Sequence, residues 1–383
     1  MDDELAAIYN ISINSRQRLS LGAASLGWGL LGASHVAERS MIEAIRRQPQ
    51  APGAPLVTGA WVAAVFSHNE HRAQQFAQMN QIAHPCINLD DLLGRREIQC
   101  VYVSSHPRHH VPLTMAALAA GKHVLCETPL ALTVADARRL QQAAADRGLV
   151  LGVNHARRGH PILREMHKAI ASGMIGDILG GRISNATLLQ TQFQTWRLQA
   201  NGGGVVFDRT IHALDLIRFL LVDEIAQVSA ISAQQILGEL PADGAEPLVE
   251  EDVLTVVRTA RRNVTLQLHD SFVIPHNQTS VEIYGSSGAL IARGCLAAQE
   301  TGDLLLVRNQ QITPIPVAAV DPYWTSIYAF HAAVRATNPS QASSLPDREP
   351  LATAEDGIQS VMAALAVRQS IARRMAIRPT YLA

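Results

Sequence analysis

The spacing of hydrophobic and polar positions divides the chain near residue 153. Up to that point, short apolar runs alternate with segments of helical periodicity, and polar residues follow each run. This alternation predicts an α/β fold: a Rossmann-type, doubly wound parallel sheet over residues 27–153, with a ligand crevice at the carboxyl ends of its strands. The expected strands are 26–31, 61–66, 84–87, 100–104, 123–126 and 149–153.

The pattern changes after residue 154. After a helix at 161–171, strand-like runs follow one another, interrupted by a helix expected at 210–221 and followed by closing helices at 324–336 and 352–373. Val264, Leu266 and Leu268 alternate with polar neighbours, which is typical of a half-buried antiparallel strand. We therefore expect residues 154–350 to form a substrate-binding α+β domain with a largely antiparallel, open-faced sheet, and residues 351–383 to form a closing C-terminal helix. The open face would allow a homo-oligomer. The expected strands are 177–189, 226–233, 253–259, 264–272, 280–284 and 289–293.

Composition narrows the function classes. The 383 residues carry a formal net charge of −1, which gives no global attraction to nucleic acid or to an anionic membrane. The four cysteines are scattered, no apolar run is long enough for a membrane span, and the chain opens M-D-D-E; together these features predict a cytoplasmic protein. Residues 1–26 form an N-terminal extension, which could be a short helix, an arm onto a neighbouring subunit or a disordered segment.

The segment W-G-L-L-G-A-S-H-V-A at 28–37 predicts a strand, a tight turn and a helix N-terminus. Such a turn presents backbone N–H groups to a phosphate. Gly32 and Ala37 keep the outer positions of the dinucleotide fingerprint G-x-G-x-x-G/A, but Ser34 occupies the middle position. We expect the turn to bind a pyrophosphate through residues Gly32, Ala33, Ser34, His35 and Val36; an ordinary buried strand-turn-helix is the alternative.

The tips of the following strands supply the rest of the expected cofactor site. The second strand ends in Ser67 and His68, with Arg72 nearby, and lacks the carboxylate that binds the ribose 2′-hydroxyl of NAD. This favours NADP over NAD, unless Arg72 only solvates a helix start. The tips of the next strands add further expected contacts: Ser104, Ser105, His106, His110, Glu127 and Thr128.

Candidate chemistry in the second half begins at Asp208 and His212, which lie four residues apart at a predicted helix start. A histidine there could pass a proton to or from an alcohol oxygen, with the carboxylate orienting it or binding a hydroxyl. The alternative is an N-capping aspartate and a structural histidine. Other candidate substrate contacts are the pair Trp196 and Arg197, which also suits a phosphate, and the pair Asn154 and His155.

Several other chemistries lack their defining residues. His106, His109 and His110 cluster, yet no spacing is completed by a carboxylate or cysteine as in a zinc site, so no metal is expected. The sequence also contains neither the G-x-S-x-G turn of serine hydrolases nor a Walker lysine.

With these motifs in hand, the chain resembles the Gfo/Idh/MocA family of sugar and polyol oxidoreductases, and within it the NADPH-dependent reductases of 1,5-anhydro-D-fructose. The likeness extends from about residue 28 to the last helix. It implies NADP(H), a sugar-like ketone or polyol as substrate, and catalysis by His212 with Asp208 and Thr128. The motifs that carry it are W-G-L-L-G-A-S at 28–34, V-Y-V-S at 101–104, A-G-K-H-V-L-C-E-T-P-L-A at 120–131, N-H at 154–155, W-R-L at 196–198 and G-G-G-V-V-F-D-R-T-I-H at 202–212.

One motif departs from the family. Where the resemblance implies E-K-P, with a lysine beside the nicotinamide, this chain has Glu127-Thr128-Pro129. Threonine donates a neutral hydrogen bond but places no cation on a developing alkoxide, and losing such a donor typically costs about 3 kcal/mol. Three functions stay open: an oxidoreductase in which His212 transfers the proton, helped by His106 or Arg209; a sensor of NADP or sugar that has lost catalysis; and a redox-cycling glycosidase.

Overall fold

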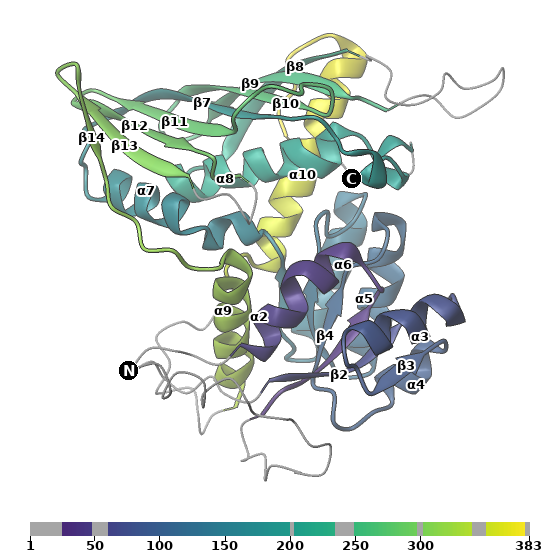
Figure 1. Ribbon diagram of the computed structural model, residues 1–383. Helices are drawn as coiled ribbons and strands as arrows, with labels where there is room; N and C mark the ends of the chain where they lie inside the picture. Colours follow the sequence, from purple (N-terminus) through teal and green to yellow (C-terminus); the bar gives the residue numbers. More distant parts are fainter. Residues whose placement is uncertain are drawn as a thin grey trace, which may run out of the picture.

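The computed structural model describes residues 25–47, 60–199, 203–233, 249–296, 302–338 and 350–379. Nearly all of the N-terminal extension expected at 1–26 lies outside these residues. The described chain forms two sheets with helices between and around them (Figure 1). The expected fold class, a Rossmann-type parallel sheet followed by an α+β unit, is confirmed.

The first sheet has six parallel strands in the order β3-β2-β1-β4-β5-β6, so that the strand order reverses between β1 and β4. Ligands of such sheets bind at this reversal, outside the carboxyl ends of the strands. The strands are β1 (Gly27–Leu31), β2 (Trp61–Phe66), β3 (His84–Cys86), β4 (Cys100–Val103), β5 (His123–Cys126) and β6 (Leu151–Val153).

Three helices of this half, α3, α4 and α6, begin where the sequence supplies a side-chain acceptor. The side chains of Asn69, Asn88 and Thr133 each accept a hydrogen bond from a backbone N–H of the helix that follows. The helices are α2 (Ile42–Arg46), α3 (Glu70–Met79), α4 (Leu89–Leu93), α5 (His110–Ala119) and α6 (Val134–Ala145); a π-helical turn, η1 (Ala37–Met41), leads into α2.

The second sheet has eight strands in the order β14-β13-β12-β11-β7-β10-β9-β8 and is antiparallel except between β7 and β10. The alternation expected along β10 is present, since Leu266 and Leu268 are buried while Thr265 and Gln267 are exposed. Strands β13 and β14 were not expected from the sequence. The strands are β7 (Ile178–Ala186), β8 (Ile225–Ala233), β9 (Asp252–Thr259), β10 (Thr265–Ser271), β11 (Ser280–Gly285), β12 (Gly288–Arg293), β13 (Asp303–Arg308) and β14 (Gln311–Pro314).

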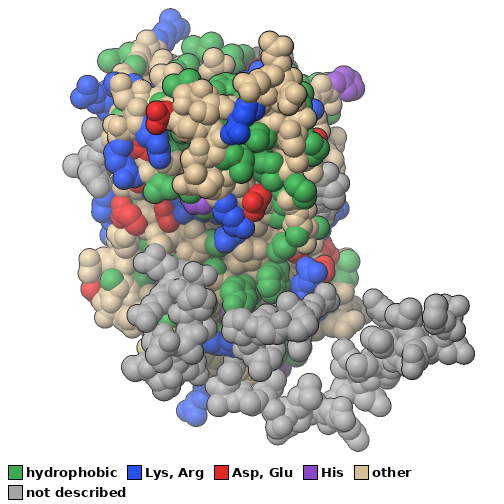
Figure 2. All heavy atoms as spheres, turned by 90° about the vertical axis from the view of Figure 1, so that its left-hand side faces the viewer, with side chains coloured by type: hydrophobic (Ala, Val, Ile, Leu, Met, Phe, Trp, Pro, Cys, Tyr) green, Lys and Arg blue, Asp and Glu red, His purple; other side chains and the backbone are tan. Residues whose placement is uncertain are grey.

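Helices α7 (Pro161–Ala171) and α8 (Ile211–Leu221) cover the face of the second sheet that is turned toward the first (Figure 1). The opposite face exposes apolar side chains on adjacent strands: Ile231 of β8 is 68% exposed, and Leu254 of β9 is 50% exposed. On the side of the molecule seen in Figure 2, basic and acidic side chains are interspersed with hydrophobic and uncharged ones. Among the described helices, none is long and apolar enough to cross a membrane.

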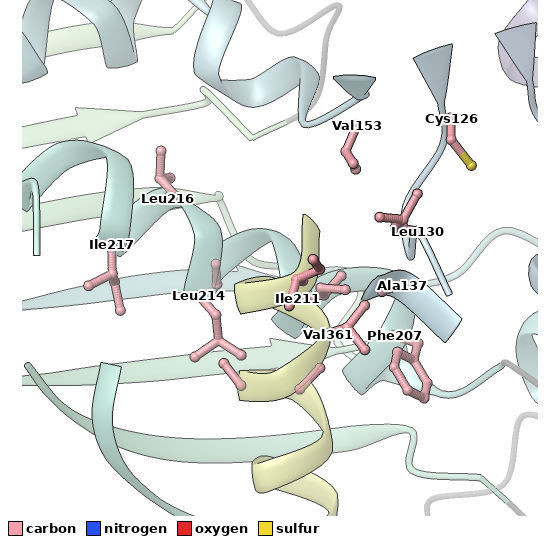
Figure 3. Close-up of a cluster of buried hydrophobic side chains, with 14 of the residues drawn as sticks. Cys126, Leu130, Ala137, Val153, Phe207, Ile211, Leu214, Leu216, Ile217 and Val361 are labelled. Carbon is pink, nitrogen blue, oxygen red and sulfur yellow. The ribbon is translucent and has the colours of Figure 1, made fainter. Parts of the chain in front are cut away.

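Two C-terminal helices join the halves. Helix α9 (Pro322–Ala336) returns to the first sheet, where Phe330 and Ile327 share a core with Trp28 and Tyr102. Helix α10 (Ala354–Arg373) lies in a second, larger core that draws side chains from both halves (Figure 3). The domain boundary proposed at residue 350 therefore leaves α9 with the second unit, although its buried side chains pack in the first.

Candidate active site

The turn after β1 brings three strand tips together. Gly32 has φ +127°, a backbone conformation that is essentially restricted to glycine, and a Cβ built on it would lie 3.0 Å from the Ser105 nitrogen. Its own N–H donates to the Phe66 carbonyl at the end of β2 (3.1 Å). Ser34 Oγ donates to Ser104 Oγ (2.7 Å) and accepts from the Ala37 N–H (3.2 Å). The serine in place of the middle glycine thus fixes the turn against β4.

Arg72, expected to bind a 2′-phosphate, lies beside this turn. Its Nε and Nη2 donate to the Ala33 carbonyl at 3.1 and 2.6 Å, so its positive charge is held against the turn. Ser67 Oγ accepts from the Asn69 N–H (3.3 Å), and the His68 ring lies edge-on to Phe66. No carboxylate stands at the tip itself, where Phe66 is followed by Ser67 and His68.

His110 connects the tips of β4 and β5. In the first turn of α5, its buried ring places Nδ1 2.7 Å from the Pro129 carbonyl and Nε2 3.0 Å from the Ser105 carbonyl. Burial lowers the pKa of this imidazole, against the two carbonyl contacts that raise it. The His110 ring therefore links the backbone that follows β4 to the backbone that follows β5.

Glu127, at the end of β5, accepts two hydrogen bonds on the same carboxylate oxygen. The donors are the Tyr102 hydroxyl and Asn154 Nδ2, the latter at 2.6 Å. Burial raises the pKa of Glu127, although both donors act in the opposite direction. Asn154 Oδ1 in turn accepts from the Ser326 hydroxyl (2.8 Å), so this network ties β5 to α9 and holds the Thr128–Pro129 segment, whose peptide bond is cis.

Thr128 and His212 meet across the two halves. Thr128 Oγ1 lies 3.1 Å from His212 Nε2, and His212 Nδ1 has no hydrogen-bond partner among the described residues. Burial lowers the pKa of His212 well below its usual value, and interactions with the Arg157 guanidinium and the His155 ring lower it further. The imidazole is therefore neutral at physiological pH, with one nitrogen directed at the threonine hydroxyl.

Asp208 does not pair with His212. It lies inside a π-helical turn, η6 (Val206–Thr210), that precedes α8, and its Oδ1 accepts from Arg197 Nε at 2.8 Å. The Arg197 guanidinium also lies over the Trp196 ring, 4.5 Å from its centroid. Asp208 and the Trp196–Arg197 pair thus form one connected unit, separate from the Thr128–His212 contact.

A single cavity of about 1160 Å³ connects these features, from the Gly32 turn to His212. Every residue expected from the sequence to contact cofactor or substrate lines it, except His155. The His155 ring is 2% exposed and packs edge-on against His212, with Nδ1 3.4 Å from Asp215 Oδ2. It does not line the cavity and touches the site through its ring contact with His212.

The cavity also has lining residues that sequence reasoning missed. Arg157 and Tyr323 line it, and Phe193 lines it beside Arg197. The sequence carried one relevant signal, the pair Arg157-Arg158 directly after Asn154-His155, but nothing local indicates which of the two faces a ligand. In the part of the chain that the structure describes, no group of three or more His, Cys, Asp or Glu could hold a metal ion.

Comparison with known proteins gives a consistent result. Residues 26–155 match the model of the Gfo/Idh/MocA oxidoreductase family, NAD-binding Rossmann fold, and residues 163–291 match that of the GFO/IDH/MocA C-terminal domain. The chain is 35% identical to a 1,5-anhydro-D-fructose reductase from Ensifer adhaerens, over 90% of this chain and 96% of that protein.

Solved structures share the fold. A 3-ketoreductase from Actinomadura kijaniata, in complex with NADP and TDP-benzene, is 25% identical, with a TM-score of 0.75 over 91% of this chain and 98% of its own. An inositol dehydrogenase homologue from Azotobacter vinelandii, in complex with NADH and myo-inositol, has a TM-score of 0.76 at 19% identity over 93% and 98% of the two chains. The second likeness concerns the fold alone.

Proposed function

Because the chain belongs to the Gfo/Idh/MocA family of NAD(P)-dependent oxidoreductases, we propose that it interconverts a sugar-like ketone and its alcohol with NADP(H), and that His212 transfers the proton. The observation that carries the proposal is the Thr128–His212 contact in the cavity that begins at the Gly32 turn. An oxidoreductase of this kind needs a proton-transfer group where a cofactor crevice meets a second domain, and His212 has that position.

The residues at the strand tips fit a dinucleotide. A side chain at Gly32 would collide with the residues that follow β4, so this position requires glycine. Because glycine has no side chain, a pyrophosphate can come close to the N–H groups of the turn. Ser34 adds a hydroxyl. Ser67, His68 and Arg72 would hold a 2′-phosphate, since they offer hydrogen bonds and positive charge with no carboxylate at the tip. This favours NADP over NAD.

When bound, the nicotinamide would supply or accept the hydride. The chain's own residues handle the proton. During reduction, His212 delivers a proton to the new alcohol oxygen, and during oxidation it removes that proton; such transfer typically contributes 10²–10⁴-fold to the rate. Thr128 orients the imidazole through Nε2, while Glu127 and His110 fix the backbone on either side of Thr128.

The other cavity side chains suit a polyhydroxylated substrate. Trp196 offers an aromatic face to a sugar ring, and Arg197 and Asp208 supply donors and acceptors beside it. Asn154 keeps one amide hydrogen beyond its bond to Glu127. We also propose that the exposed face of the second sheet joins two copies of the chain.

The test has two stages. Titration with NADPH and NADH, followed by nicotinamide fluorescence, should show tighter binding of NADPH. Turnover is then measured with NADPH and 1,5-anhydro-D-fructose, and with NADP⁺ and myo-inositol or glucose. The proposal predicts turnover that falls on the order of 10²-fold or more in His212→Ala. Binding without turnover, converted to turnover by Thr128→Lys, would instead favour the sensor. Tighter binding of NADH would contradict the assignment of Ser67 and Arg72.

A further inference from the structure

Two consecutive arginines in the short helix η3 (Ala156–Gly159) have opposite environments. Arg158 is turned inward and makes a bidentate ion pair with Asp215, supplemented by Asp356. Arg157 is turned to the cavity, which it lines together with His212, Thr128 and Asn154. Its Nη1 is buried and has no hydrogen-bond partner within the described part of the chain. A buried donor of this kind is costly unless a ligand satisfies it.

The charge of Arg157 acts on the proposed proton-transfer group, with which it shares the cavity. Burial is the largest cause of the lowered pKa of His212, and the charge of Arg157 is the second largest. Burial also lowers the pKa of Arg157, while the nearby carboxylates of Asp270 and Asp208 raise it in part. Because a guanidinium stays protonated in proteins, the site holds a permanent cation beside a neutral imidazole.

Three other arginines of the region already make hydrogen bonds or an ion pair. Arg72 is bound to the Ala33 carbonyl, and Arg197 is paired with Asp208. Arg209, considered from the sequence as a helper of His212, donates to the carbonyls of Asn185, Thr187 and Ser271 and does not line the cavity. Arg157 is therefore the arginine beside His212 that has a donor to spare.

Building on the proposed function, we propose that Arg157 Nη1 donates to the substrate oxygen that exchanges its proton with His212, and that Arg157 thereby supplies the cation that Thr128 does not. In reduction, the substrate carbon accepts a hydride from the reduced nicotinamide, the C=O π pair moves to oxygen, and Arg157 stabilises the oxyanion. His212, which is neutral at rest, takes up a proton from solvent as the oxyanion forms, delivers it to that oxygen and returns to the neutral imidazole. The sum is ketone, NADPH and H⁺ converted to alcohol and NADP⁺.

The experiment compares Arg157→Met with Arg157→Lys, and uses Arg164→Met as the matched control because Arg164 is exposed on α7 and does not line the cavity. With NADPH and 1,5-anhydro-D-fructose, Arg157→Met should lower kcat on the order of 10²–10³-fold. Arg157→Lys should retain more activity because it keeps the charge. The NADPH dissociation constant should stay within about twofold in all three variants.

Two readouts separate this role from a purely structural one. Because the Arg157 charge lowers the pKa of His212, Arg157→Met should move the His212-dependent limb of the kcat/KM profile to higher pH. The double variant Thr128→Lys/Arg157→Met restores a cation to the site at position 128. Its kcat should be at least about tenfold higher than that of Arg157→Met alone.

The outcomes distinguish the two proposals. If the wild type is active and Arg157→Met leaves kcat unchanged, the role of Arg157 is overturned and the proposed function stands. The same holds if Arg157→Lys lowers kcat as much as Arg157→Met does and Thr128→Lys restores none of it. A wild type that binds NADPH without turnover, while Thr128→Lys alone turns over, also overturns the role of Arg157. Failure of every variant to bind either nicotinamide cofactor overturns the proposed function itself.

Discussion

Replacement of Gly32 by alanine should damage both the fold and cofactor binding. The residue has φ +127°, and an added Cβ would meet the Ser105 nitrogen at 3.0 Å and the Ser104 carbonyl group at 3.1 Å. The strained backbone alone costs about 1–3 kcal/mol, and relief of the contacts requires the turn to move away from β4. Loss of one charge-assisted N–H bond to a pyrophosphate costs about 1.5–3 kcal/mol, which is roughly 10- to 150-fold in affinity.

The assay is urea unfolding together with NADPH titration, and the chain supplies its own control. Gly148 also has a positive φ, +63°, but apart from its chain neighbours no atom of the described residues lies within 4 Å of its added Cβ, and it does not line the cavity. Gly148→Ala should therefore cost only about 1 kcal/mol of the free energy of unfolding and leave NADPH affinity unchanged. The reasoning is refuted if Gly32→Ala binds NADPH as tightly as Gly148→Ala and is equally stable.

Three further predictions concern stability and assembly. Asp215→Asn removes one of the two carboxylates that pair with buried Arg158, the other being Asp356, and should lower the free energy of unfolding by about 3 kcal/mol in urea unfolding; a loss below about 1 kcal/mol would contradict the argument. Burial lowers the pKa of His331, whose Nε2 accepts from Trp28 Nε1, to about 3. The unfolded chain therefore takes up this proton first as the pH falls below 6.5, and wild-type stability should fall toward pH 4 by up to about 1.4 kcal/mol per pH unit from this group. His331→Gln should show a shallower slope, and an identical slope would refute the assignment. Leu254→Arg on the open sheet face should give monomers in light scattering where the wild type gives oligomers, and unchanged mass would exclude that face.

The local pattern was sufficient for most of the fold. The observed bounds of β2, β5 and α7 agree with those expected, because each combines an apolar run with a clear stop or start, such as Pro161 at the first position of α7. Strands β13 and β14 were missed for a physical reason. Residues 304–307 form an uninterrupted apolar run, and all of β14 is exposed at the sheet edge, so neither shows alternation.

The sequence predicted many of the residues that line the site, but not which of their side chains contact one another. Strand tips collect at one edge of a parallel sheet, which explains why Gly32, Ser104 and Glu127 share a cavity. The i to i+4 spacing suggested that Asp208 orients His212 or binds a hydroxyl; in the structure the carboxylate lies in a π-helical turn and accepts from Arg197 instead of contacting His212. Contacts between residues far apart in the chain, such as Thr128 with His212, depend on how the two halves pack. No local pattern encodes them.

The most direct test of the account is a crystal structure of the protein with NADP⁺. The account predicts the pyrophosphate on the N–H groups of the Gly32 turn, the 2′-phosphate beside Arg72, and the nicotinamide next to Thr128. It also predicts that the ring's reactive carbon faces a space bounded by His212 and Arg157, where a substrate would lie about 3–3.5 Å from it. A nicotinamide directed away from His212, or a cofactor bound outside this cavity, would contradict the account.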